Sequence, residues 1–199
     1  MAELNRTNKT CCGEGEEEDI DSGNSLIKVI DNRIYFYSEI TDQSALDLQE
    51  KLYKMQDCLA KTFLRGCGCT IDLYLNSVGG DVVAALALAD EINTSPIPIK
   101  CIVQGQCISA ATLICVSAKY RAIKKNSFMM IHDISSMVRG KFSEISDNVE
   151  NAKMLREKIR KIYLAHTKIP AKKLTDLLKS DIMLDANQCV KLGLVDKIE

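Results

Sequence analysis

The sequence predicts an α/β fold in which strands alternate with helices, followed by one unusually long helix. Apolar segments with strand character at 33–37, 71–75 and 99–103 are each followed by a helical pattern, and such repeated units form parallel strands with crossover helices. A helical periodicity then runs from Lys141 to His166, about 25 residues or roughly 37 Å. Because this exceeds the usual helix length in globular proteins, we expect the helix to protrude from the body of one subunit.

The first 25 residues are expected to form a flexible acidic tail. Acidic residues recur there among glycines and polar residues: Glu14, Glu16, Glu17, Glu18, Asp19 and Asp21. Such a segment buries too little apolar area to offset the entropy of ordering, and it lacks the apolar core of a signal peptide. Residues 26–199 are expected to form a single domain, since a chain of 199 residues can bury roughly 70% of its unfolded surface.

Charge, hydropathy and cysteine usage exclude several classes of protein. The 26 basic and 27 acidic residues balance, so no nucleic-acid partner is predicted, and no apolar run approaches the roughly 20 residues of a membrane span. The nine cysteines do not indicate a disulfide framework, because several lie within apolar patterns where cysteine behaves as a small hydrophobe (Cys101, Cys107, Cys115 and Cys189). No zinc-site spacing is present. We expect neither metal nor cofactor, and a reducing compartment, either the cytoplasm or a reducing organelle interior.

The N-terminal half is expected to contain a hairpin and two strand–helix units. Strands at 26–30 and 33–37 flank the turn pair Asp31-Asn32. A helix then begins at Thr41 or Asp42 and ends near Gly66, with apolar residues at three- and four-residue steps. The strand at 71–75 exits through the loop 76–80, and Asp81 opens a helix that ends before Ser95.

The C-terminal half adds a third unit and several short elements. The strand that begins at 99 passes through a sharp turn into a helix at 109–118, and a second apolar strand at 128–131 ends on His132. After the long helix we expect a short helix at 171–178 and a β-type run at 180–184. A capping box follows at 185–188, and a final strand at 194–198.

Ser109 and His132 are the candidate residues for nucleophilic catalysis. Ser109 is expected in the first turn of its helix, in the positive field of unpaired backbone N–H groups. His132 is placed where a strand meets a loop, and a serine nucleophile requires such a base. Each residue also has a structural interpretation, Ser109 as a helix N-cap and His132 as a satisfied strand-end residue.

Three aspartates compete for the role of the acid that orients the base. Asp133 adjoins His132, so strand alternation directs it to the opposite face. Asp185 is better explained as a helix N-cap, which leaves Asp181, before a short β-type run. The other histidine, His166, lies near the end of the long helix, where a capping role is expected.

Four segments resemble the ClpP family of self-compartmentalised serine peptidases. They are residues 73–80, 105–109, 126–132 and 193–196, in the family's order, and the resemblance extends from about Ile27 to Ile198. The spacings from Gly80 to Ser109 and from His132 to Asp181 match the family pattern. The resemblance implies a ClpP/crotonase-like fold of repeated strand–helix units, in which the long helix is the protruding handle of the domain.

The resemblance also implies the role of each site residue. Ser109 would be the nucleophile, His132 the general base and Asp181 the residue that holds the imidazole, while the N–H groups of Gly80 and Ala110 would bind the oxyanion. Unfolded polypeptides would be cleaved inside two stacked heptameric rings. By the same resemblance, a hexameric ATP-driven unfoldase of the ClpX, ClpA or ClpC type would feed the chamber. This chain has no phosphate-binding Gly-x-x-x-x-Gly-Lys-Ser/Thr loop, so we expect it to hydrolyse no ATP itself.

The sequence departs from the family at several positions, and other functions stay open. Val78 replaces the family's proline before the Gly-Gly pair, residues 133–136 replace a Gln-Pro and glycine pattern, and the acidic tail replaces apolar pore loops. We therefore expect a divergent member. The alternatives are a capsid-maturation protease, a crotonase-like acyl-thioester enzyme that uses Gly79-Gly80 without a serine, and a non-catalytic ring subunit.

Overall fold

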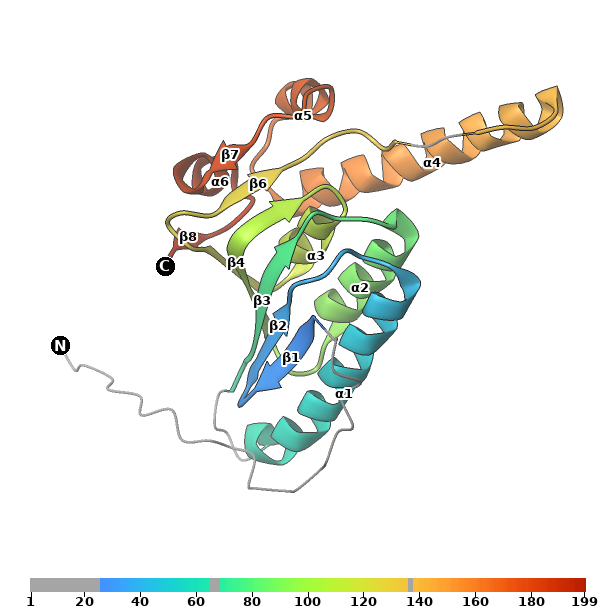
Figure 1. Cartoon of the computed structure of the whole chain (residues 1–199). Coiled ribbons are helices and arrows are strands. Elements are labelled where there is room, and N and C mark those ends of the chain that lie inside the picture. The colour runs from blue at the N-terminus through green and yellow to red at the C-terminus, as the bar shows by residue number, and fades with distance from the viewer. Residues whose placement is uncertain (1–25, 65–68, 136–137) are drawn as a thin grey trace.

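A single eight-stranded sheet organises the part of the chain that the structure describes (Figure 1). The structure is a computed structural model that describes residues 26–64, 69–135 and 138–199, so the expected tail at 1–25 lies outside it. The elements are β1 (Ile27–Ile30), β2 (Arg33–Phe36), α1 (Asp42–Leu64), β3 (Ile71–Ser77), α2 (Val82–Thr94), β4 (Ile99–Ile108), α3 (Ala111–Ser117), β5 (Tyr120–Ile123), β6 (Phe128–Met130), α4 (Phe142–His166), α5 (Ala171–Leu178), β7 (Leu184–Asp185), α6 (Ala186–Leu192) and β8 (Lys197–Ile198).

The long strand β4 joins the two halves of this sheet. The main strand order of the sheet is β1-β2-β3-β4-β5-β8. Neighbouring strands are parallel except in the β1–β2 hairpin, which confirms the predicted α/β fold. On the side away from β3, β4 pairs first with β5 through Lys100–Val103 and then with β6 through Gln106–Ile108. The change of neighbour falls at Gly105, where φ is 100°. The end of β4 is thereby brought beside β6, the strand that leads to His132.

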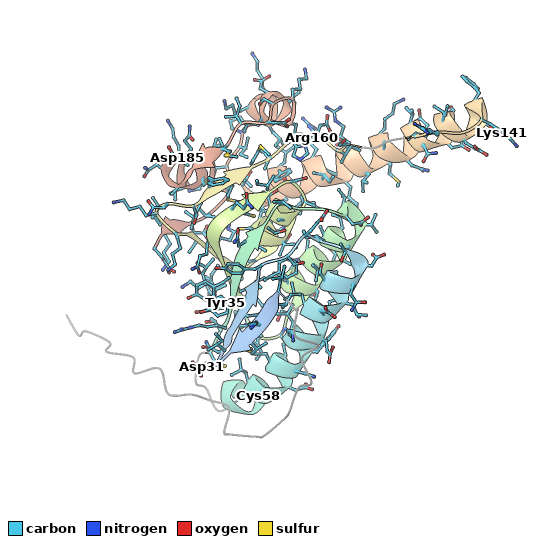
Figure 2. The ribbon with its side chains drawn as sticks, in the orientation of Figure 1. Asp31, Tyr35, Cys58, Lys141, Arg160 and Asp185 are labelled. Atoms are coloured by element: carbon cyan, nitrogen blue, oxygen red, sulfur yellow. The ribbon has the colours of Figure 1, made fainter. Side chains whose placement is uncertain are left out.

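Alternation along the strands gives the sheet one buried face. In β3 the residues Ile71, Leu73 and Leu75 are fully buried, while the residues between them are half-buried. Helices α1, α2 and α3 pack on the sheet's buried side (Figure 1). Tyr35, labelled in Figure 2, stacks on Tyr74 with ring centroids 4.7 Å apart and marks the other, half-exposed face. The apolar core therefore lies between the sheet and these helices.

Helix α4 extends away from the body of the molecule, as the sequence predicts (Figure 1). Lys141, at its N-terminal end, stands at the outer tip (Figure 2). Apolar side chains near that tip are exposed, Phe142 by 88%. The buried residues of the helix are Ile159 and Tyr163, close to its C-terminal end. Only the C-terminal part of α4 is thus anchored in the core.

The C-terminal elements agree with the sequence in part. Helix α5 has the predicted bounds, and Asp185 caps α6 by accepting a hydrogen bond of 2.8 Å from the N–H of Gln188. Of the β-type run expected at 180–184, only Leu184 lies in a strand, the two-residue β7, because pairing with β6 involves only Leu184 and Asp185. Strand β5 was not predicted. Its four residues carry Arg121 and are held by pairing with β4 and β8 on either side.

The cysteines follow the expected pattern with one exception. Cys101, Cys107, Cys115 and Cys189 are buried free thiols, and burial is the largest of the effects that raise the pKa of Cys107. Cys58 differs, because it is disulfide-bonded. Cys11, Cys12 and Cys67 lie outside the described residues. In the parts of the chain that the structure covers, no helix is long and apolar enough to span a membrane, and no three metal-ligating side chains gather.

Candidate active site

Ser109 occupies a sharp turn between β4 and α3. Its φ of 56° lies in the left-handed region, which costs a residue with a side chain about 1–3 kcal/mol. The sequence placed Ser109 and Ala110 in the first turn of the helix, and the structure corrects this: Ala110 is the N-cap residue and Ser109 precedes it. The reason is the positive φ of Ser109, which cannot be part of a right-handed helix. Ser109 thus lies at a corner of the chain, where β4 ends.

Backbone and side-chain hydrogen bonds hold this turn on both sides. The N–H of Ser109 donates to the carbonyl oxygen of Met130 in β6 at 2.8 Å. The carbonyl oxygen of Ser109 accepts from the N–H of Thr112 at 3.0 Å and from its Oγ1 at 2.6 Å. Thr112 Oγ1 is also 2.5 Å from the Tyr163 hydroxyl of α4. These bonds oppose the strain of the left-handed conformation and connect the turn to two other elements.

The loop after β3 passes directly over the serine. A Cβ at Gly79, where φ is 93°, would lie 2.7 Å from the carbonyl oxygen of Ile108 and 2.8 Å from the Cβ of Ser109. At Gly80, where φ is 141°, a Cβ would overlap the backbone of Ile40. Both positions therefore require glycine, for steric as well as conformational reasons. This close approach brings the Gly-Gly pair to the nucleophile turn.

Two backbone N–H groups near Ser109 are left unpaired. Ile40 bonds to the neighbours of Gly80, donating to the Gly79 carbonyl at 2.7 Å and accepting from the Asp81 N–H at 2.8 Å. Because backbone groups alternate along an extended chain, the N–H of Gly80 itself is directed away from Ile40. Within the described residues, neither this N–H nor that of Ala110 has a hydrogen-bond partner. Unpaired N–H groups of this kind are able to bind an anionic oxygen.

One cavity brings together four of the five predicted site residues. It has a volume of about 230 Å³, and its lining includes Gly80, Ser109, Ala110 and His132. Further lining residues are Val82, Leu113, Asp133, Ile134, Ser135, Ile159 and Tyr163. The cavity is thus formed by the ends of β3, β4 and β6 with a contribution from α4. The residues that line it include a serine, a histidine and the two residues whose backbone N–H groups are unpaired in the described part of the chain.

Asp181 lies outside this lining but near the histidine. Its Oδ1 is 3.9 Å from Nδ1 of His132, which is longer than a hydrogen bond. The imidazole is 26% exposed, whereas the carboxylate is 79% exposed. Asp185 caps α6, as the sequence predicts. Asp133 lines the same cavity as His132 and is not directed to the opposite face as strand alternation predicts, but its carboxylate pairs with Arg156 at 2.8 Å. Asp181 is therefore the aspartate with access to the imidazole.

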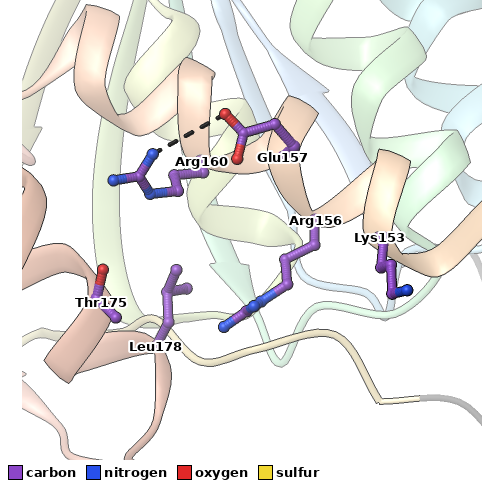
Figure 3. Close-up of a pocket in the computed structure, with 6 residues that line it drawn as sticks. All are labelled: Lys153, Arg156, Glu157, Arg160, Thr175 and Leu178. Carbon is purple, nitrogen blue, oxygen red and sulfur yellow. Dashed lines mark ion pairs between the residues drawn. The ribbon is translucent and has the colours of Figure 1, made fainter. Parts of the chain in front are cut away.

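A second cavity, of about 260 Å³, lies between α4 and α5 (Figure 3). Lys153, Arg156 and Arg160 line it from α4, opposite Thr175 and Leu178. Each of these cations has a carboxylate near it: Lys153 pairs with Glu150, Arg156 with Asp133, and Arg160 lies 3.9 Å from Glu157. The pairs are solvent-exposed and individually weak. The Arg156 pair also joins α4 to the residue that follows His132.

Sequence reasoning missed Thr112 and Tyr163 as parts of the site. Tyr163 lies within the helical periodicity at 141–166, which marks it only as one apolar position of the long helix. Thr112 is a polar residue in the short, otherwise mostly apolar helix α3, and it is fully buried. A hydroxyl within a buried apolar segment requires a partner, and that requirement is the signal that could have indicated it.

Comparisons with known proteins place the chain in a family. The family model described as Clp protease matches residues 14–199. The ATP-dependent Clp protease proteolytic subunit of Deinococcus radiodurans is 28% identical over 130 residues, and this match spans 64% of either chain. Among solved structures, a ClpP1 mutant from Listeria monocytogenes is 22% identical, with a TM-score of 0.73 over 84% of this chain and 91% of that one. The structural match shows the fold, a ClpP-like arrangement of strand–helix units.

The Gly79→Ala substitution is expected to destabilise the protein by about 1–3 kcal/mol, since the added Cβ meets Ser109 in a conformation unfavourable to alanine. Chemical denaturation measures the change. Val78→Ala is the matched control, because Val78 is exposed, and its effect should stay within about 0.5 kcal/mol. Equal stability of the two variants would contradict the close approach described for Gly79.

Proposed function

Because the chain belongs to the Clp protease family, we propose that it is a serine peptidase with Ser109 as nucleophile and His132 as general base. The observation that carries the proposal is the shared cavity, which unites Ser109 and His132 with the unpaired N–H groups of Gly80 and Ala110. The strained turn supports it further. A serine that served only as a helix cap has no need of a left-handed backbone.

In the first half of the reaction, Ser109 Oγ attacks the peptide carbonyl while His132 takes its proton. Nδ1 of His132 faces Asp181, so Nε2 is the nitrogen that receives the proton. Negative charge then develops on the carbonyl oxygen, where the N–H groups of Gly80 and Ala110 stabilise it. His132 returns the proton to the leaving amine, and an acyl-enzyme remains on Ser109.

In the second half, His132 deprotonates a water molecule that attacks the acyl carbon. The ester bond to Ser109 Oγ then breaks, His132 returns the proton to that oxygen, and the peptide acid is released. Asp181 serves to hold the imidazole in the tautomer that accepts a proton at Nε2. The separation of 3.9 Å must shorten to hydrogen-bond distance for this role, and catalytic hydrogen bonds are often long before substrate binds. The high exposure of the carboxylate leaves it free to make that movement.

The proposed substrate is an extended polypeptide. By the family resemblance it would lie between the residues after Gly80 and those after His132, pairing through main-chain hydrogen bonds. Val82, Ile134 and Leu113 supply apolar contacts at the cavity. Because main-chain pairing is independent of side chains, the preference for particular sequences should be broad. Asp133, which differs from the family pattern, also lines the cavity.

We propose that α4 is the surface through which two rings of subunits meet. Apolar residues are exposed along its outer part: Phe142, Ile145, Val149 and Met154. An exposed apolar face on a protruding helix favours association with a second copy. By the same family resemblance, the rings would be heptameric and an ATP-driven unfoldase of the ClpX, ClpA or ClpC type would supply unfolded chains. The buried free thiols favour a reducing compartment, either the cytoplasm or a reducing organelle interior.

Ser109→Ala is expected to abolish hydrolysis of an unstructured fluorogenic peptide, by about 10⁶-fold in kcat, because no other group replaces the attacking hydroxyl. Fluorophosphonate should label wild-type Ser109, as located by peptide mass mapping, and should not label the variant. A native mass unchanged by the substitution is the control for assembly. Absence of labelling on the wild-type particle would count against the peptidase, and acyl-CoA hydrolysis that survives Ser109→Ala would favour the acyl-thioester alternative.

Asp181→Ala and Asp185→Ala separate a catalytic from a capping aspartate. Asp181→Ala should lower kcat at least about 100-fold with little change in stability, because the imidazole loses its orienting partner. Asp185→Ala should leave kcat near wild type and destabilise the fold by about 1 kcal/mol, because α6 loses its cap. Peptide hydrolysis and chemical denaturation of both variants decide between the roles. The reversed pattern would reject Asp181.

Native mass measurement tests the α4 surface. Fourteen copies of a 22.1-kDa chain give a particle of about 310 kDa. The double variant Phe142→Glu/Val149→Glu places charge on the exposed apolar face and should yield single rings of about 155 kDa. Leu46→Glu makes the same change on exposed α1 and should leave the mass unaltered. A full-size particle from the α4 variant would show that the rings meet elsewhere.

A further inference from the structure

A buried chain of two hydroxyl groups ends on the carbonyl oxygen of Ser109. Thr112 Oγ1 donates to that oxygen at 2.6 Å and is 2.5 Å from Tyr163 Oη. Each hydroxyl has a single proton, and a carbonyl only accepts, so the proton of Thr112 is committed to Ser109 and Tyr163 donates to Thr112. Both side chains are almost fully buried, and burial raises the pKa of Tyr163 well above its usual range, so the phenol stays protonated as a donor.

The Ser109 carbonyl, which accepts the hydrogen bond from Thr112 Oγ1, belongs to the same peptide unit as the N–H of Ala110. A trans peptide is planar, and its C=O and N–H point in opposite directions. Fixing the Ser109 oxygen from the core side therefore fixes the Ala110 N–H in the opposite direction. Ser109 and Ala110 both line the cavity. The orientation of an oxyanion donor is thus set by a side chain that never meets the substrate.

We propose that Thr112 is a positioning residue that aims the Ala110 N–H at the oxyanion, and that Tyr163 of α4 supports it through the hydroxyl pair. The inference rests on the peptidase activity proposed above and deepens it. Holding the turn closed does not by itself require the hydroxyl, since the N–H of Thr112 already bonds the Ser109 oxygen at 3.0 Å. A valine would fill a similar volume without burying a hydroxyl.

The test compares Thr112→Val, Thr112→Ser and Tyr163→Phe in the full chain, with an unstructured fluorogenic peptide as substrate. Thr112→Val should lower kcat about 10- to 100-fold, less than the loss of a whole oxyanion donor, with KM changed by no more than about twofold. Thr112→Ser keeps the hydroxyl and should stay within about threefold of wild type. The kcat of Tyr163→Phe should lie between the values for Thr112→Val and Thr112→Ser. The affinity of a peptide boronic acid, which places an oxygen in the oxyanion site, should fall in parallel with kcat.

A double variant distinguishes positioning from damage to the fold. Thr112→Val leaves the Tyr163 hydroxyl buried without a partner, and adding Tyr163→Phe removes that group. The double variant should therefore regain thermal stability relative to Thr112→Val while kcat stays low. Recovery of kcat together with stability would overturn the inference, as would a Thr112→Val enzyme equal to wild type. A wild-type chain that neither hydrolyses peptide nor labels at Ser109 would instead refute the proposed peptidase, and this inference with it.

Discussion

The corner at which β4 turns into α3 is the constraint on which the rest of the site depends. Ser109 adopts a left-handed backbone there, and three neighbours keep it in place: β6 through the Met130 carbonyl, α3 through Thr112, and the β3 loop through the close approach of Gly79. An isolated strand–helix peptide would relax this corner, because strain of this kind persists only when the surroundings over-determine it. The surrounding strands and helices therefore enforce one unfavourable conformation at Ser109, the proposed nucleophile.

The same corner explains how the chain keeps the family's fold although some of its residues differ from the family's sequence pattern. The proposed oxyanion site uses backbone N–H groups. Backbone groups tolerate changes in neighbouring side chains as long as the path of the chain is kept. Val78 stands in the loop without disturbing the contact of Gly79 with Ser109. Asp133 departs from the family pattern, yet it acquires a partner in Arg156 and its N–H bonds the Leu178 carbonyl at 2.8 Å, so α4 and α5 both hold the histidine loop.

Much of the fold was predictable from local pattern, whereas the site was predictable only in part. The helices α4 and α5 and the cap at Asp185 follow from periodicity and capping chemistry, which act over a few residues. Strand β5 and the short β7 depend on partners distant in sequence, so local pattern misjudged them. Ser109 and His132 stood out by residue type and position. The hydroxyl pair of Thr112 and Tyr163 spans 51 residues, and no local signal links its members.

The pairing of β5 with β8 has a consequence for the order of folding. These two strands meet only after α4, α5 and α6 have been synthesised, because all three helices lie between them in the chain. Until then β5 presents an open edge of the kind that recruits foreign strands. Long-range parallel pairing is also slow to form. The nascent protein therefore passes through a period of aggregation risk, which chaperones acting during translation are suited to shorten.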